Sequence, residues 1–185
     1  MSRNVLVTLL CCFVLAGCGQ KHLKNPSEPG AALLYGFIDL QSADVPLDWL
    51  TLKKTWPPSK KPYYYAGCDG EGLFWHYNAT KGAYQVIKFG ESRKFFRGGD
   101  ILYTYDLGEI GSNETSMEVT GPGLYFVGAF KKNTTRSANM FVPGEFELVR
   151  VERPSEKHVL KMLLPLSKGT QWESMIESRI RELSK

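Results

Sequence analysis

The side chains best suited to chemistry gather in one short stretch, Cys68-Asp69-Gly70-Glu71-Gly72, with His76 close behind it. A thiol, an imidazole and a carboxylate are the parts of a nucleophile, a base and an orienting group. The alternative is a glycine-rich turn with one inert cysteine, because a reactive thiol needs an activating environment that nothing in the sequence provides. We therefore predict no catalytic residue. A thiol enzyme or hydrolase that uses Cys68 and His76 stays as an alternative hypothesis.

Metal and cofactor sites have no signature in the sequence. The three histidines (His22, His76 and His158) are far apart, and no cysteine or histidine pair has zinc spacing. The acidic run at residues 69–72 lacks the spaced ligands of a calcium loop. A nucleophile elbow, a phosphate loop and a dinucleotide fingerprint are all missing. The sequence predicts no metal and no cofactor.

Two polar segments are better candidates for binding. Residues 55–62 (TWPPSKKP) are stiff, aromatic and basic, and Tyr63, Tyr64 and Tyr65 follow. Exposed aromatic side chains are typical anchors for protein or glycan partners, so Trp56 and the three tyrosines form the candidate partner-binding site. The alternative is that Trp56 and one or two tyrosines pack into the edge of the core. The second segment, Lys131 to Arg136, is expected to be a solvated hairpin tip.

The N-terminus has the three parts of a secretory signal. Arg3 supplies a positive charge, an apolar run extends from Val5 to Leu15, and small residues follow. The apolar run is too short to span a bilayer, which takes about 20 residues. We expect residues 1–17 to be removed.

The tetrapeptide Leu15-Ala16-Gly17-Cys18 resembles the lipobox of bacterial lipoproteins. The resemblance implies that the Cys18 thiol receives a diacylglyceryl group and that a peptidase cleaves just before it. In that family an Asp after the cysteine favours retention at the inner membrane. Here Gly19 follows, so the resemblance implies a lipid anchor at the periplasmic face of the outer membrane.

Charge and cysteine content restrict the remaining classes. Without residues 1–17, which carry Arg3 as their one charged side chain, the net charge falls from +4 to +3. A surplus this small predicts no nucleic-acid partner. With Cys11 and Cys12 removed and Cys18 lipidated, Cys68 would be alone. The fold would then be held by its apolar core without an intramolecular disulfide.

The rest of the chain divides into a tether, a β-domain and a helical end. Residues 18–30 are polar with two prolines and predict a flexible lipidated tether. Residues 31–152 alternate short apolar-aromatic runs with turn residues. We expect strands at 33–40, 48–54, 72–77, 83–89, 101–107, 115–119, 124–131 and 146–152.

One turn motif occurs three times ahead of these strands, at Lys81-Gly82, Pro122-Gly123 and Pro143-Gly144. Each glycine is followed by any residue, an aromatic residue, any residue and an aliphatic residue. Glycine accepts the positive φ that such a turn requires. The aromatic and aliphatic residues, two apart, should enter the same sheet face.

Helical spacing replaces the strand pattern in residues 153–185. Ser155 and Glu156 open a helical stretch that Pro165 interrupts. Thr170 and Glu173 have the spacing of a capping box before a last amphipathic helix. We expect that helix to pack on the β-domain.

Residues 72–74 (GLF) followed by 81–84 (KGAY) resemble a motif of transthyretin-like and carboxypeptidase-regulatory-like domains, although Lys81 replaces the usual proline. The resemblance implies a small sandwich without chemistry of its own. The predicted fold is an antiparallel β-sandwich, transthyretin-like or immunoglobulin-like, with one or two C-terminal helices. The leading functional hypothesis is a non-catalytic binding or scaffolding lipoprotein of the cell envelope with an envelope protein as partner. A carbohydrate- or peptidoglycan-binding module acting through Trp56 and Tyr63 to Tyr65 is the other alternative.

Overall fold

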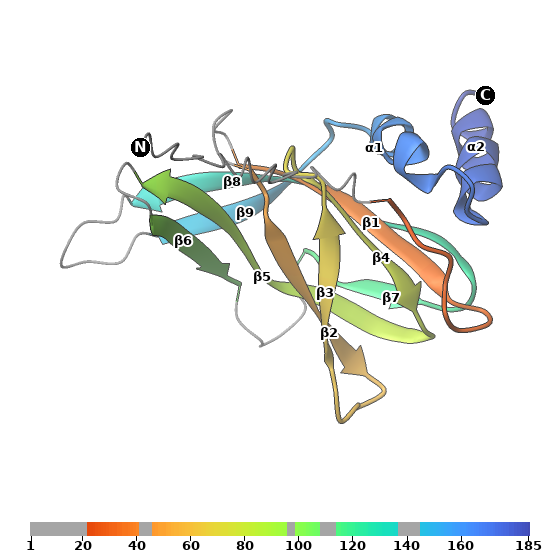
Figure 1. The fold of residues 1–185 in the computed structure, drawn as a ribbon, viewed down its shortest axis with the longest axis horizontal. Helices are drawn as coiled ribbons and strands as arrows, with labels where there is room; N and C mark the ends of the chain where they lie inside the picture. The colour runs from red at the N-terminus through yellow and green to blue at the C-terminus, as the bar shows by residue number, and fades with distance from the viewer. Residues whose placement is uncertain (1–21, 41–45, 96–98, 108–113, 137–144) are drawn as a thin grey trace, which may run out of the picture.

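The computed structural model describes residues 22–40, 46–95, 99–107, 114–136 and 145–185. This part of the chain is mainly β, with two short helices at its C-terminal end (Figure 1). The strands are β1 (Ala32–Asp39), β2 (Trp49–Trp56), β3 (Tyr63–Cys68), β4 (Leu73–Ala79), β5 (Gly82–Phe95), β6 (Gly99–Asp106), β7 (Met117–Val119), β8 (Gly123–Arg136) and β9 (Glu145–Val151). The helices are α1 (Glu156–Leu163), the 3-10 turn η1 (Leu164–Ser167) and α2 (Trp172–Glu182).

The strands form one mixed sheet in the order β6-β5-β2-β3-β4-β1-β8-β9, with β7 paired to β5. The expected strands are all present, but the prediction of a purely antiparallel sheet is wrong because β1 and β8 run parallel. Hairpin connections force neighbouring strands to be antiparallel. Six strands separate β1 from β8 along the chain, so no hairpin fixes their relative direction.

β3 is the strand that the sequence analysis did not predict, and it joins the two halves of the sheet. Its first part pairs with β2, where Tyr63 faces Lys53, and its end pairs with β4, where Cys68 faces Phe74. Gly67 lies at this transition, and a Cβ there would be 2.5 Å from the ring of Trp75. Two separate packed sheets are therefore replaced by a single sheet that curls into a nearly closed barrel.

The concave side of this sheet encloses the main core. Its buried members come from most of the strands and include Leu34, Leu50, Phe74, Val86 and Phe130. The barrel has a seam between the two ends of the sheet, where the ring of Tyr105 on β6 lies 5.1 Å from that of Phe146 on β9. A groove lined by residues of β6, β9 and the segment before β7 follows this seam.

The repeated turn motif behaves as predicted where the structure describes it. Gly82 and Gly123 have φ of +147° and +151°. The aromatic and aliphatic residues after each turn contribute to the same core inside the barrel, in the pairs Tyr84 and Val86, Tyr125 and Val127, and Phe146 and Leu148. The third turn, Pro143-Gly144, lies outside the described residues.

The convex face of β1, β4 and β8 carries a second core, which the helices cover. Leu33 and Trp75 from the sheet meet Leu160, Trp172 and Ile176 from the helices in this layer. α1 begins after the predicted Ser155, whose Oγ accepts from the backbone N–H of His158. The predicted capping box does not form. Gln171 occupies the N-cap position of α2 without a side-chain hydrogen bond, and the Glu173 carboxylate accepts from the N–H of Gly169. The expected packing of the last helix on the β-domain is confirmed.

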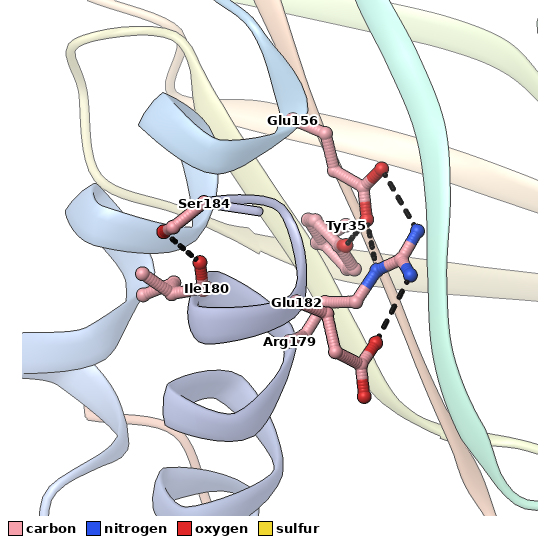
Figure 2. A network of polar contacts seen from close by, with 6 residues as sticks. All are labelled: Tyr35, Glu156, Arg179, Ile180, Glu182 and Ser184. Atoms are coloured by element: carbon pink, nitrogen blue, oxygen red, sulfur yellow. Dashed lines mark hydrogen bonds and ion pairs between the residues drawn. The ribbon is translucent and has the colours of Figure 1, made fainter.

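A partly buried polar network fixes the helices to the sheet (Figure 2). The hydroxyl of Tyr35 on β1, a fully buried side chain, donates to Glu156 Oε1 at 3.0 Å. Arg179 on α2 donates to the same carboxylate from Nε at 2.9 Å and from its terminal nitrogen at 3.3 Å. Burial, with the nearby Glu156 carboxylate, raises the pKa of Tyr35 well above its usual range. One carboxylate therefore joins β1, α1 and α2.

The N-terminal segment is packed against this helical layer. Leu23 is 2% exposed and belongs to the second core. Its N–H donates to the carbonyl of Leu166 at 2.8 Å, and the carbonyl of Lys24 accepts from Trp172 Nε1 at 3.0 Å. The packed part of the chain therefore includes Leu23, which lies within the predicted tether of residues 18–30. The sequence pattern missed this because one leucine among polar residues shows no periodicity.

Candidate functional site

The β2–β3 hairpin carries the candidate binding residues. It projects from the sheet on the side away from the helices (Figure 1). Three prolines occur in the loop between the strands, and the carbonyl of Pro62 accepts from the N–H of Lys54 at 2.7 Å. At the end of β2, a Cβ at Gly82 would be 2.1 Å from the carbonyl oxygen of Trp56. Glycine at this position allows β5 to approach the end of β2 closely.

Strand alternation decides which of the three consecutive tyrosines face solvent. Tyr63 and Tyr65 are 50% and 81% exposed, whereas Tyr64 between them is half-buried. The ring of Tyr64 lies 5.1 Å from that of His76 and 6.0 Å from that of Tyr84, at the edge of the barrel core. Trp56, at the end of β2, is 59% exposed. Three of the four candidate aromatics are thus accessible, and Tyr64 supports them from below.

The hairpin is basic as well as aromatic. Lys60 and Lys61 in its loop and Lys81 in the adjacent turn are exposed. Lys53, opposite Tyr63, has its ammonium 5.7 Å from the ring centroid of that tyrosine. Lys54, in contrast, points inward and donates to Thr80 Oγ1 at 2.6 Å. An aromatic surface with a positive rim suits an acidic or sugar-containing partner.

Cys68 and His76 are both buried in this structure. Cys68 is 1% exposed in the main core, and Phe74 is its partner across the β3–β4 ladder. His76 is 8% exposed, and its Nε2 has no hydrogen-bond partner. Burial lowers the pKa of His76 to about 4, so the ring is neutral at physiological pH. The thiol is therefore enclosed in the core, and the neutral imidazole is nearly as well buried.

Asp69 organises the turn that contains the acidic cluster. Its carboxylate accepts from the N–H groups of Glu71 at 2.7 Å and Leu73 at 3.0 Å. Burial raises the pKa of this carboxyl group, although the two backbone N–H groups act in the opposite direction. Gly70 and Gly72 have positive φ, as a tight turn requires. The cluster therefore closes the connection between β3 and β4.

The second candidate segment is a strand and not a hairpin tip. β8 continues through Lys131 to Arg136 and pairs with β9. Lys132 is 7% exposed, and its Nζ donates to the hydroxyl of Tyr105 at 2.7 Å. The polar sequence hides an inward-facing lysine, which is why composition predicted a solvated loop.

Among the described residues, no group of three or more histidine, cysteine, aspartate or glutamate side chains could hold a metal ion. In the same part of the chain, neither helix is long and apolar enough to cross a membrane. Cys18 lies outside the described residues.

No family model, curated protein or solved structure matches the chain. The exposure of Trp56, Tyr63 and Tyr65 makes the β2–β3 hairpin the candidate site.

Proposed function

We propose that the chain is a lipid-anchored, non-catalytic binding module of a bacterial cell envelope. In this proposal Cys18 carries the lipid at the periplasmic face of the outer membrane, and the β2–β3 hairpin binds an envelope protein. The observation that carries the binding role is the exposure of Trp56, Tyr63 and Tyr65 on one ordered hairpin. Several exposed aromatic side chains on one surface element are typical of interaction sites.

The lipid anchor is supported by the residues 15–18 (LAGC) and the apolar run before them. Each buried methylene contributes about 0.8 kcal/mol, and stable anchoring takes more than one acyl chain. Radiolabelled palmitate should be incorporated by the parent chain and by Cys68→Ala, but not by Cys18→Ser. Incorporation that persists in Cys18→Ser would contradict the anchor.

A photocrosslinking amino acid placed at Tyr65 tests the binding role. Tyr65 is the most exposed of the three aromatics, so the probe should yield one reproducible crosslinked envelope protein. The same probe at Val149, which is 38% exposed on β9, is the matched control and should not capture that protein. Trp56→Ala with Tyr63→Ala should abolish capture from position 65 without lowering the melting temperature by more than a few degrees, as expected for exposed sites. Equal capture from both positions would refute a specific site.

Exposed Trp and Tyr rings also favour a glycan partner, since sugars stack on aromatic faces. Cosedimentation with purified peptidoglycan distinguishes a glycan partner from a protein partner. A protein partner predicts no pelleting, whereas a glycan module predicts pelleting that Trp56→Ala abolishes.

A further inference from the structure

The packing of Leu23 against the helical layer restricts how an anchored molecule would lie on a membrane. Leu23 is fixed by its buried side chain and by the hydrogen bond from its N–H to Leu166 on η1. The next two residues continue along the start of α2, where Asn25 Oδ1 accepts from the N–H of Gln171 at 2.8 Å. The N-terminal chain therefore enters the folded body beside η1.

The distance from this entry point to Cys18 is short. Five residue steps separate Cys18 from Leu23. At full extension they span at most about 18 Å, since each residue adds about 3.3–3.6 Å. Acyl chains on Cys18 would hold the backbone of Leu23, which lies beside η1, within about 18 Å of the anchor point, whatever path the connecting residues take.

This surface is basic. Lys24 follows the docked leucine, Lys161 lies in the last turn of α1, and Lys168 directly follows η1. The three lysines and Pro165 in η1 are exposed. The nearby Glu173 carboxylate accepts a hydrogen bond from the N–H of Gly169 at 2.9 Å. We call Lys24, Lys161, Pro165 and Lys168 the η1 surface.

We infer that the η1 surface lies on anionic phospholipid headgroups when Cys18 is lipidated, an inference that rests on the proposed anchor. Headgroup phosphates attract lysines that lie within a Debye length, about 8 Å at physiological ionic strength. The anchor raises the effective concentration of the two surfaces, so even weak individual contacts become populated. In this orientation the β2–β3 hairpin, which projects from the other side of the molecule, points away from the bilayer (Figure 1).

Amine acetylation of the full-length lipidated protein in vesicles tests the orientation lysine by lysine. One vesicle contains equal parts of phosphatidylglycerol and phosphatidylcholine, and the other contains phosphatidylcholine alone. We expect Lys24, Lys161 and Lys168 to be acetylated about 3-fold or more slowly on the anionic vesicle. Lys60, Lys61 and Lys81 at the hairpin end are the matched controls and should react equally on both. Raising the salt from about 0.15 M to about 1 M should remove the difference, because it shortens the Debye length to about 3 Å.

The outcomes of this experiment test the lipid anchor and the orientation of the molecule separately. Absence of palmitate from the purified protein would overturn the anchor itself. A palmitoylated protein that floats with the vesicles but shows equal rates at all six lysines would overturn the orientation alone. Protection of the hairpin lysines in place of the η1 surface would show that the molecule lies the other way round.

Discussion

Two tyrosine hydroxyls close the turns that lead into β5 and β8. The Tyr84 hydroxyl accepts from the N–H of Thr80 at 2.9 Å and donates to the carbonyl of the same residue at 2.9 Å. Tyr125 repeats this arrangement with Gly121, at 3.1 and 3.0 Å. The repeated Gly-x-aromatic pattern predicted the turn and the inward direction of each ring. The pattern did not predict the role of the hydroxyl. The third copy of the motif has Phe146, which has a ring but no hydroxyl, so the motif itself requires only the aromatic ring.

Replacing Tyr84 by Phe should destabilise the protein by about 1–3 kcal/mol, since it leaves a backbone donor and acceptor of Thr80 without their partner. Tyr84 is 1% exposed, so water cannot readily replace the hydroxyl. Tyr125→Phe is the matched control and should cost less, because Tyr125 is only half-buried. Urea unfolding of the two variants measures the difference, and an equal or larger loss in Tyr125→Phe would contradict the explanation.

His76 should make the protein sensitive to acid. Its pKa is lowered from 6.5 to about 4 in the folded state by burial, so folding favours the neutral ring. The contribution of His76 to the free energy of unfolding is therefore fully present above about pH 6.5. It is lost as the pH decreases toward 4, and the loss is on the order of 3 kcal/mol. His76→Leu should remove this component of the pH dependence of urea unfolding. His158→Gln, an exposed histidine on α1, should leave it unchanged. A His76→Leu protein with the parent's pH profile would refute the assignment.

At the scale of elements, the Glu156 carboxylate is the point where β1, α1 and α2 meet (Figure 2). The helices were predicted from spacing, but this connection was not, because Tyr35 and Arg179 are distant in sequence from Glu156 and from each other. Only the folded sheet brings them together.

Glu156→Ala should lower the free energy of unfolding by about 1–3 kcal/mol, mainly because the buried Tyr35 hydroxyl loses its acceptor. The contribution of the ion pair itself is small, since Arg179 is 41% exposed and solvent screens it. Glu182→Ala removes the more exposed partner of the same arginine and should change stability by less than about 0.5 kcal/mol. Hydrogen exchange of the α2 amides should accelerate in Glu156→Ala alone. Equal acceleration in both variants would show that Glu156 does not fix α2 to the sheet more strongly than Glu182 does.

Strands with a clear aromatic and β-branched pattern could be predicted from the sequence, whereas β3 could not. Tyr63, Tyr64 and Tyr65 show no polar-apolar alternation, and the prolines before them and Gly67 after them indicate a loop. The lengths of β5 and β8 were underestimated for a similar reason, since their outer halves are polar. The exposed residues of the candidate site depend on the same missed strand, because its alternation turns Tyr64 inward and its neighbours outward.

At the scale of the whole molecule, β3 makes the sheet continuous. Without it, the remaining strands would divide into two groups, β6-β5-β2 and β4-β1-β8-β9. With it, β2 and β4 become connected through one strand and the sheet curls on itself. The parallel neighbours β1 and β8 are a second feature that no local pattern encodes, because their pairing joins segments far apart in the chain.

The position of β1 has a consequence for how the protein is made. β1 is synthesised first among the strands, yet its two neighbours are β4 and β8. A nascent chain that ends before Gly123 leaves one edge of β1 without hydrogen-bond partners, and such an edge invites pairing with other chains. The central ladder can close only after residues through β8 have emerged, so contacts between distant segments should dominate the folding barrier and make folding slow. Until then, the open edge of β1 stays free of wrong pairing only if nascent chains are kept away from one another.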